Sequence, residues 1–444
     1  IIFIFFSNQS YSAQSFQIIR DAEIELFLHK IIKSTIGERK SKNFHPRLVL
    51  NNEYNAFVTG SNKIYINTGL INKSNSLSEI QAVLAHEIGH LALNHYNSRL
   101  VNSKNLSNYS KLATLAGVAL SVQGKLDANS AVGLMIGSND LATKSLLQFS
   151  RIQEQQADKF ALDQLIKNKI SLIGLEKLLT KLANEELNNS NTPKNYYRSH
   201  PFSKQRLEQV KKYKLQYQKV SFDEQKISLN NNLISLKYIK NKIKAYSVDP
   251  NDLMKNLEYK NEFLSNYTQM IALYRLGKYD LAQKKLSLIK NKYKKYPFFS
   301  ELKGDIYYKE GKFNTAINEY EKAIHTLQEV FSPSTDLIKF SLIKAYLQTN
   351  NSANLNKSII LLEELLLNNP NWSYLWRLLS KVSGKLNKKG MAYIALAEEA
   401  LIKKNFIKAK KYVDLANKQT SLPISYKLRG SDILNKIRLK YKNK

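Results

Sequence analysis

The first quarter of the chain contains the segment Glu79-Ile80-Gln81-Ala82-Val83-Leu84-Ala85-His86-Glu87-Ile88-Gly89-His90, followed by Leu91-Ala92-Leu93-Asn94. These flanking residues favour a helix that runs through both histidines. Ser78, directly ahead of the segment, is a suitable N-cap for it. His86 and His90 are four positions apart, so on a helix their imidazoles lie on one face, about 5–6 Å apart.

The spacing of the two histidines indicates a metal site. Two imidazoles on one helical face can both reach a single Zn²⁺ at about 2.0–2.1 Å. Glu87 points to the adjacent side, where it can accept a proton from a water that the metal activates. Because the chain has only 7 histidines, this pattern is a strong signal. It predicts a catalytic zinc with His86 and His90 as ligands and Glu87 as the general base.

A catalytic zinc needs a third protein ligand, for which Glu154 is the candidate. It lies in the predicted helix Ser150-Arg151-Ile152-Gln153-Glu154-Gln155-Gln156-Ala157-Asp158. Glu154 and Asp158 share a face of this helix, so Glu154 can bind the metal while Asp158 accepts the free ring N–H of a ligand histidine. Two acids on a solvated face are the alternative. The small Ala157, which permits close approach of a second helix, favours the metal site.

The remaining histidines differ in what their surroundings suggest. His200 precedes Pro201 and is therefore expected in an extended or turn conformation. It can close the metal site as a fourth ligand, stabilise the oxyanion, or lie on a surface loop; the sequence leaves these open. His95 is five residues past His90 and leaves the ligand face, so we interpret it as structural. Three more histidines have no supporting context: His29, His45 and His325.

Composition excludes several classes of protein. The chain has 444 residues and no cysteine, which rules out disulfides, a cysteine nucleophile, thiolate zinc sites and iron–sulfur clusters. Lys and Arg number 68 against 36 Asp and Glu, a net charge of +32. The lysines are scattered along the chain, and no nucleic-acid-binding motif accompanies them, so no specific nucleic-acid partner is predicted. Peripheral contact with an acidic membrane surface remains open.

Two apolar regions bear on export and membranes. Residues 1–6 read Ile-Ile-Phe-Ile-Phe-Phe, and small polar residues follow. We interpret residues 1–13 as a partial signal peptide, which predicts an exported protein; the alternative is a buried N-terminal strand. Leu112–Val122 and Ala131–Ile136 are too short to span a bilayer. They suggest a helical hairpin packed in protein, or one against a membrane or substrate groove.

The second half of the chain is repetitive. Gly277, Tyr279 and Ala282 recur as Gly311, Phe313 and Ala316, each 34 residues later. This period, with small residues where two helices touch, is typical of tetratricopeptide repeats (TPRs). A weaker third copy and further helical segments follow. Such repeats stack into a solenoid that binds peptides or proteins.

The motifs together resemble one family. The His86–His90 segment, the segment from Ser150 to Asp158, and His200-Pro201 with Arg206 are similar to those of the HtpX/BepA-type zinc metallopeptidases, gluzincins related to the CAAX prenyl proteases. One departure is Gln156, which is neutral where relatives often carry a charge. The resemblance implies a mainly α protein: a gluzincin-type domain with a small β-sheet over residues 14–215, a linker over 216–255, and a TPR α-solenoid over 256–444.

The resemblance also implies a function. Asn55-Ala56-Phe57 is similar to the family's edge strand, where an extended peptide substrate can add to the sheet. The expected activity is endoproteolysis with one Zn²⁺ per chain. The export signal and repeats are most similar to the periplasmic, beta-barrel assembly-enhancing branch of the family. That branch implies misfolded or unfolded protein substrates in the periplasm, outer-membrane assembly machinery as a partner of the TPR face, and His200 as a cap on the zinc.

A second hypothesis belongs to another class. The chain can act chiefly as a chaperone or adaptor, with its solenoid recruiting clients while proteolysis is rare or gated. Intact ligands and Glu87 argue against a dead site, but they do not set how often it turns over.

Overall fold

The structure is a computed structural model. It describes residues 3–4, 17–58, 62–95, 149–187, 200, 203–217, 235–255, 261–290, 296–328 and 335–442. The chain separates into two compact units whose main boundary lies between Lys278 and Tyr279. The segments Leu112–Val122 and Ala131–Ile136 lie outside the described residues.

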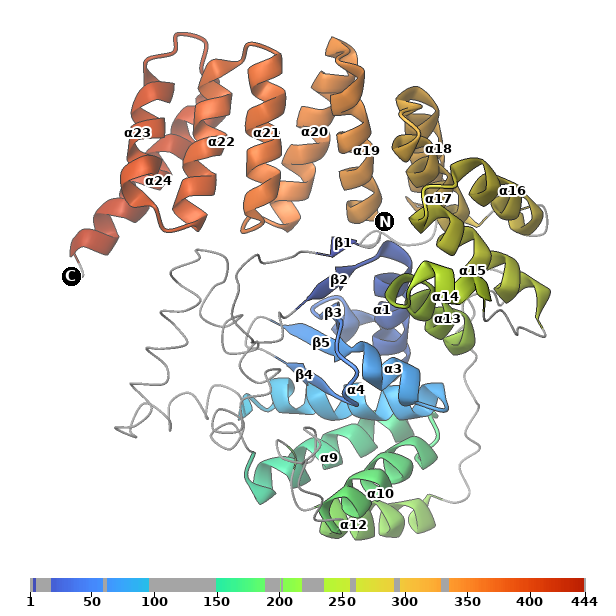
Figure 1. Cartoon of the computed structure of the whole chain (residues 1–444). Coiled ribbons are helices and arrows are strands. Elements are labelled where there is room, and N and C mark those ends of the chain that lie inside the picture. Colours follow the sequence, from blue (N-terminus) through green and yellow to red (C-terminus); the bar gives the residue numbers. More distant parts are fainter. Residues whose placement is uncertain are drawn as a thin grey trace. The chain divides into compact units, whose positions relative to one another are not determined.

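The first unit is built on a five-stranded sheet of order β1-β2-β3-β5-β4 (Figure 1). The central pair, β3 (His45–Val49) and β5 (Lys63–Asn67), is parallel. The other pairs are antiparallel: β1 (Phe3–Ile4) with β2 (Ile18–Arg20), β2 with β3, and β4 (Ala56–Val58) with β5. Almost all of β5 is buried, as expected for a central strand rich in Ile and Tyr.

Helices pack against this sheet and carry the residues of the predicted site. Helix α1 (Ala22–Ile36) contacts β3, and α4 (Leu77–Ala92) contacts β4. Three further helices pack in sequence around α4: α9 (Arg151–Lys167) and α10 (Ile173–Leu187) contact it directly, and α12 (Ser203–Gln216) packs on α10. The short helices α2 (Glu38–Ser41) and α3 (Thr68–Lys73) complete this part of the unit.

The predicted N-cap of the histidine helix is wrong by two residues. Helix α4 begins at Leu77, so its N-cap is Ser76, and Ser78 lies inside the first turn. The Ser78 hydroxyl is 2.9 Å from the Ser76 hydroxyl, and Ser76 makes no side-chain cap bond. The first turn of α4 packs closely on α10: a Cβ on Gly174, at the beginning of α10, would lie 2.1 Å from the Ser78 carbonyl oxygen.

Helices from the predicted linker also belong to the first unit. These are α13 (Leu236–Ser247) and α14 (Pro250–Lys255), and α15 (Glu262–Arg275) follows them. Lys242 of α13 is buried, with its ammonium 2.8 Å from Asp21 and 2.6 Å from Glu23 at the start of α1. Tyr238 donates a hydrogen bond to the same Glu23 carboxylate. A buried ion cluster therefore ties α13 to the N-terminal part of the unit.

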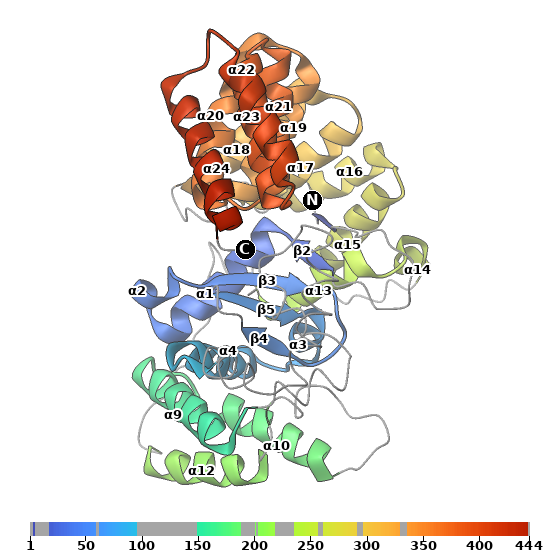
Figure 2. The same ribbon diagram turned by 90° about the vertical axis from the view of Figure 1, so that its left-hand side faces the viewer.

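The second unit is a row of antiparallel helices, each contacting the next (Figures 1 and 2). They are α16 (Tyr279–Lys290), α17 (Pro297–Lys309), α18 (Phe313–Gln328), α19 (Thr335–Thr349), α20 (Ser352–Asn368), α21 (Ser373–Lys385), α22 (Lys389–Ile402), α23 (Phe406–Asn417) and α24 (Ile424–Lys442).

The local geometry of the repeats confirms the 34-residue pattern. Gly277 and Gly311 have φ values of 74° and 78°, which favour glycine, and each ends one helix of a pair. At Gly304 a Cβ would lie 2.7 Å from the Tyr320 ring, so only glycine allows this helix contact. The mainly α fold with a small sheet and a TPR-type solenoid is therefore as predicted.

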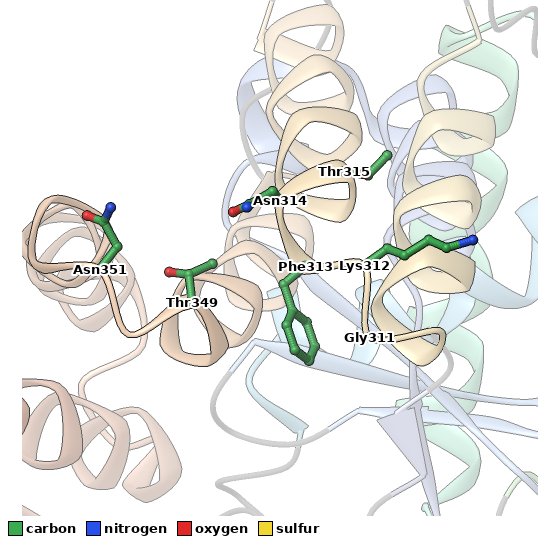
Figure 3. A pocket seen from close by; sticks show the side chains of 7 residues that line it. All are labelled: Gly311, Lys312, Phe313, Asn314, Thr315, Thr349 and Asn351. Carbon is green, nitrogen blue, oxygen red and sulfur yellow. The ribbon is translucent and has the colours of Figure 1, made fainter.

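Two further features of the described residues concern surfaces. A pocket of about 430 Å³ opens where the α17–α18 turn faces the end of α19 (Figure 3). Its lining residues are Gly311, Lys312, Phe313, Asn314, Thr315, Thr349 and Asn351. Within the described part of the chain, none of the helices combines the length and apolar character needed to cross a membrane.

Candidate functional site

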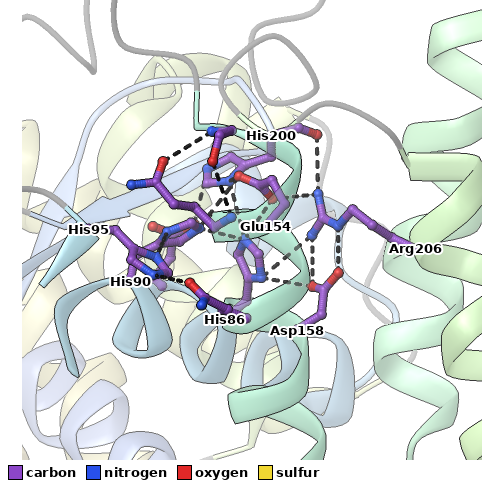
Figure 4. A network of polar contacts seen from close by, with 11 residues as sticks. His86, His90, His95, Glu154, Asp158, His200 and Arg206 are labelled. Carbon is purple, nitrogen blue, oxygen red and sulfur yellow. Dashed lines mark hydrogen bonds and ion pairs between the residues drawn. The ribbon is translucent and has the colours of Figure 1, made fainter. Parts of the chain in front are cut away.

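Four buried side chains converge at the centre of the first unit (Figure 4). His86 and His90 come from α4, Glu154 from the first turn of α9, and His200 from the residues just before α12. One donor atom from each lies within 4.8 Å of all the others. The structure thus brings together four residues that are spread over 114 positions of the chain, from His86 to His200.

The separations between these donor atoms suit a metal ion. His86 Nε2 is 3.1 Å from His90 Nε2 and 3.2 Å from His200 Nδ1, and Glu154 Oε1 is 3.0 Å from His200 Nδ1. Ligands bound at 2.0–2.1 Å in a tetrahedron lie about 3.3–3.4 Å apart. The donor atoms of His86, His90, Glu154 and His200 face one another, so their lone pairs can converge on a single cation. The residues therefore fit a four-coordinate metal ion.

The two helices that supply the ligands approach closely because of two small residues. A Cβ on Gly89 would lie 3.0 Å from the carbonyl oxygen of Ala157 and 3.1 Å from its Cα. Ser150 forms a capping box with Gln153, which starts α9 and places Glu154 in its first turn. The close contact at Gly89 and the capping box at Ser150 therefore position the ligands of α4 and α9.

Asp158 and Arg206 back the ligands on one side. His86 Nδ1 is 2.9 Å from Asp158 Oδ1, so the ring N–H donates to that carboxylate and Nε2 stays free for a metal. Arg206, which is 1% exposed, binds both oxygens of Asp158 and lies 2.6 Å from Glu154 Oε2. Its Nη1 also donates to the carbonyl oxygen of His200, at 3.2 Å.

These contacts set the charge states of the metal-free site. Burial would raise the pKa of Glu154, but Arg206 and His200 hold that pKa well below its usual range. The pKa of Asp158 is lowered by Arg206 in the same way. For His86 the two carboxylates outweigh burial and raise the pKa to about 9, whereas burial holds the pKa of His90 well below normal. A cation entering the cluster would displace the proton on His86.

His200 and Glu87 lie against each other beside the cluster. His200 is 2% exposed, and its Nε2 is 3.3 Å from Glu87 Oε1 while its Nδ1 faces the metal ligands. The structure therefore places His200 inside the site and not on a surface loop; a fourth ligand and an oxyanion-stabilising residue both stay predictions. Glu87 is 1% exposed and lies on the same side of the cluster as His200.

Residues 55–57 occupy the edge of the sheet next to the histidine helix. Among the described strands, β4 is the last in the sheet order and pairs with β5, and α4 contacts it. Asn55, Ala56 and Phe57 are all buried, and the Phe57 ring stacks on Tyr65 with centroids 5.0 Å apart. The side-chain oxygen of Asn55 is buried without a hydrogen bond. This edge is therefore covered rather than open to solvent.

Two neighbours of His90 in the structure are not indicated as site residues by the sequence. His95 lies outside the ligand cluster, in keeping with a structural residue, but its Nδ1 is 3.0 Å from His90 Nδ1 and its Nε2 is 3.0 Å from Gln156 Oε1. The ring of Phe149 stacks on His90 with centroids 3.6 Å apart. The usable signal was Asn94, a residue type that readily takes the left-handed conformation that ends a helix.

Comparison with known proteins finds two family matches along the chain. Residues 19–214 match Peptidase family M48, and residues 269–344 match the tetratricopeptide repeat-like domain. Residues 19–214 are thus a Peptidase family M48 domain, followed by a tetratricopeptide repeat-like domain. The chain is a metalloprotease.

Individual relatives are similar over most of the chain. The Beta-barrel assembly-enhancing protease of Yersinia pestis is 23% identical over 388 residues, covering 82% of this chain and 74% of the relative. The protein of the same name from Escherichia coli K12 is 21% identical over 356 residues, with 80% and 70% covered. Metalloprotease LoiP of E. coli K12 is 28% identical over 166 residues, or 36% of this chain and 58% of LoiP. The yeast Tom70 crystal structure aligns over 82% of each chain at 14% identity, with a TM-score of 0.30, too low to support an argument.

Proposed function

We propose that this chain is a zinc-dependent endopeptidase that acts on misfolded or unassembled proteins in the periplasm, as part of outer-membrane protein quality control. One observation carries the enzymatic part: three histidine nitrogens and a carboxylate oxygen lie within 4.8 Å of one another, with Glu87 beside them. The relatives named for beta-barrel assembly support the biological setting.

Zinc is the proposed ion, with one bound per chain. His86, His90 and Glu154 would hold it, a two-histidine, one-carboxylate set that leaves a fourth position. The chain has no cysteine to favour a softer metal. Asp158 supports the assignment because it fixes the tautomer of His86.

The chain's own residues would perform the proton transfers. A zinc ion held by His86, His90 and Glu154 would supply Lewis-acid chemistry, polarising the scissile carbonyl and lowering the pKa of the attacking water. Glu87 accepts the proton of that water and later passes it to the leaving amine. Arg206 keeps Glu154 and Asp158 ionised, so neither carboxylate competes with Glu87 for the proton.

His200 is proposed to cap the metal in a resting enzyme. Its Nδ1 is 3.0 Å from Glu154 and 3.2 Å from His86, within the range of a fourth ligand, and its Nε2 contacts the general base. Both the open coordination position and Glu87 are then blocked. Such a cap would protect bystander proteins, and activity would require His200 to leave.

The edge strand is proposed to bind substrate by strand addition. β4 has the edge position next to α4 that this requires, and backbone pairing suits substrates of varied sequence. Because Asn55, Ala56 and Phe57 are buried, whatever covers the edge must move before a peptide can pair there. Access to the strand and removal of His200 are two separate steps toward an active enzyme.

Export and partner binding complete the proposal. Residues 1–13 would be part of a signal peptide, and the pairing of Phe3–Ile4 with β2 would then belong to the uncleaved chain. The helical repeats would recruit unfolded proteins and the outer-membrane assembly machinery, and the pocket near Gly311 offers one contact surface (Figure 3). Contact with a membrane surface rests on the net charge of +32.

The test is to purify residues 14–444, measure bound zinc and assay casein degradation beside Glu87→Gln. One equivalent of zinc, with cleavage lost in the variant, would support the endopeptidase. Absence of bound zinc would contradict it. Zinc without cleavage in either protein would indicate a capped site or a structural metal, and His200→Ala would then distinguish them.

The adaptor hypothesis remains the second candidate because the solenoid fills most of the chain beyond Tyr279. It predicts that Glu87→Gln still rescues outer-membrane defects in cells that lack the protein. Loss of rescue in this variant, at normal protein levels, would instead show that proteolysis is the function that matters.

A further inference from the structure

His95 returns to the metal site because helix α4 ends directly after its second ligand. The helix stops at Ala92, and Asn94 has a left-handed φ of 57°. On a continued helix His95 would lie some 140° around the axis from His90. The turn at Asn94 instead brings the His95 ring beside His90, with ring centroids 5.2 Å apart, and leaves it 4% exposed.

The contacts of His95 allow only one direction of hydrogen bonding if His90 binds a metal. His90 Nε2 faces the ligand cluster, so its lone pair must be free and the ring proton must be on Nδ1. Nδ1 then donates to His95 Nδ1, at 3.0 Å. The proton of His95 is therefore on Nε2, which donates to Gln156 Oε1, also at 3.0 Å. The opposite direction would put a proton on His90 Nε2 and block the metal.

We propose that His95 and Gln156 are positioning residues that hold His90 with its Nε2 lone pair directed at the metal, a proposal that rests on the proposed metal function. Figure 4 shows His95 behind His90, on the side away from Glu154. His95 is therefore not itself a ligand of the same ion, because its bonded Nδ1 faces the far nitrogen of His90.

Stacking on Phe149 alone cannot direct Nε2 of His90 at the metal. Phe149 lies parallel to the His90 ring at 17° and 3.6 Å, which fixes the ring plane. A His90 ring flipped by 180° about its Cβ–Cγ bond would keep the ring plane and the stacking but move Nε2 away from the cluster. The hydrogen bond to His95 distinguishes the two orientations, since only one of them places a ring N–H opposite His95 Nδ1.

The two ligand histidines are consequently supported in different ways. His86 donates to a carboxylate that is itself bound by Arg206. His90 donates to the neutral imidazole of His95, which in turn donates to the neutral side-chain amide of Gln156. This arrangement gives a role to Gln156, the neutral residue noted in the sequence, because its amide oxygen can accept a hydrogen bond from His95 Nε2.

The experiment compares zinc affinity and cobalt spectra in the full-length chain. His95→Leu removes the acceptor, whereas His95→Asn keeps an oxygen near the position of Nδ1. Loss of a partner that orients a ligand typically weakens metal binding about 10–100-fold. We expect that loss for His95→Leu by chelator competition, together with a changed visible spectrum of the Co²⁺-loaded protein. His95→Asn should stay close to the parent chain in both measurements.

Gln156 provides a second pair of variants at an exposed position where folding is not at risk. Gln156→Met keeps the length but cannot accept, and should weaken zinc binding several-fold. Gln156→Glu can only accept, so it should bind zinc at least as tightly as the parent.

His29→Leu is the matched control for His95→Leu, since His29 is similarly buried in α1 but absent from the cluster. The zinc affinity of His29→Leu should not change.

The outcomes separate the two proposals. If the parent chain binds no zinc, the proposed metal function fails and this inference fails with it. If the parent binds zinc and His95→Leu matches it in affinity and cobalt spectrum, only the positioning role is wrong. Equal losses in His95→Leu and His95→Asn would also overturn it, because they would reflect packing. Should His95→Leu not fold, an unchanged affinity in Gln156→Met would be decisive against the proposal.

Discussion

Arg206 binds Asp158 through two parallel contacts, Nε to Oδ2 at 2.5 Å and Nη2 to Oδ1 at 2.8 Å. The same guanidinium lies 2.6 Å from Glu154 and donates to the backbone of His200. One side chain of α12 thus joins a proposed ligand, the partner of a second ligand and the segment that carries the cap. Its rigid fork can make these contacts together, which a lysine cannot.

Arg206→Lys should therefore damage the site far more than its conservative character suggests. Removing one partner of a buried charge cluster typically costs about 3–5 kcal/mol, and Lys would restore only part of it. We expect a clear fall in unfolding stability and loss of zinc, measured by denaturant titration and metal analysis. Arg377→Lys is the control, because that arginine is 57% exposed in its contact with Glu399. Equal stability of the two variants would contradict this role of Arg206.

Glu87→Gln should abolish catalysis without removing the metal. The variant keeps all four donor atoms of the cluster but cannot accept a proton. General-base catalysis contributes about 10²–10⁴-fold, so casein cleavage should fall by at least that lower factor. Zinc content, measured on the same samples, should remain at the parental level. A variant that retains zinc and cleaves normally would exclude Glu87 as the base.

His200→Ala should increase casein cleavage if His200 caps the resting site. The substitution removes Nδ1 from the ligand cluster and Nε2 from its contact with Glu87. Zinc affinity should fall modestly, since three ligands remain. Reduced cleavage with retained zinc would mean that His200 takes part in the chemistry, for example by stabilising the oxyanion, rather than blocking it.

Acid should destabilise the first unit partly through His29. Burial, with smaller contributions from His45 and Lys33, lowers the pKa of His29 to about 4. The unfolded chain binds this proton near pH 6.5. The contribution of neutral, buried His29 to the free energy of unfolding is therefore fully present above pH 6.5 and is lost as the pH falls toward 4. The loss is roughly 1–3 kcal/mol after allowing for solvent screening.

His29→Leu should flatten this pH dependence. The measurement is urea unfolding of the parent and the variant at pH 7 and pH 5, taken as a difference so that other groups cancel. His325→Leu, at an exposed position of α18, is the control and should leave the slope as it is. An unchanged slope in His29→Leu would show that His29 is not the group responsible.

Much of the fold followed from local pattern. The 34-residue recurrence from Gly277 to Gly311 predicted the repeats, because each repeat needs the same left-handed turn and the same small residues between helices. The histidine helix was predicted to within two residues at its start. The sequence pattern predicted a linker over residues 216–255, whereas residues 235–255 form helices of the first unit. Local pattern could not show this, because these helices are held in place by the buried ion pairs of Lys242 with Asp21 and Glu23, more than two hundred positions away.

The sequence by itself determined the chemical type of the site: two histidines on one face of a helix, a glutamate on the adjacent side, and Glu154 and Asp158 four positions apart on a second helix. Helical periodicity is a local property, so spacing alone orders these groups. Only the tertiary structure decided where His200 lies, that Arg206 joins three of these residues, and that His95 turns back to His90. The positions of His200 and Arg206 depend on how the helices pack, and the position of His95 depends on the left-handed backbone conformation of Asn94. Spacing along one helix follows from the sequence, but the distances between residues on different elements are fixed only when those elements pack against each other.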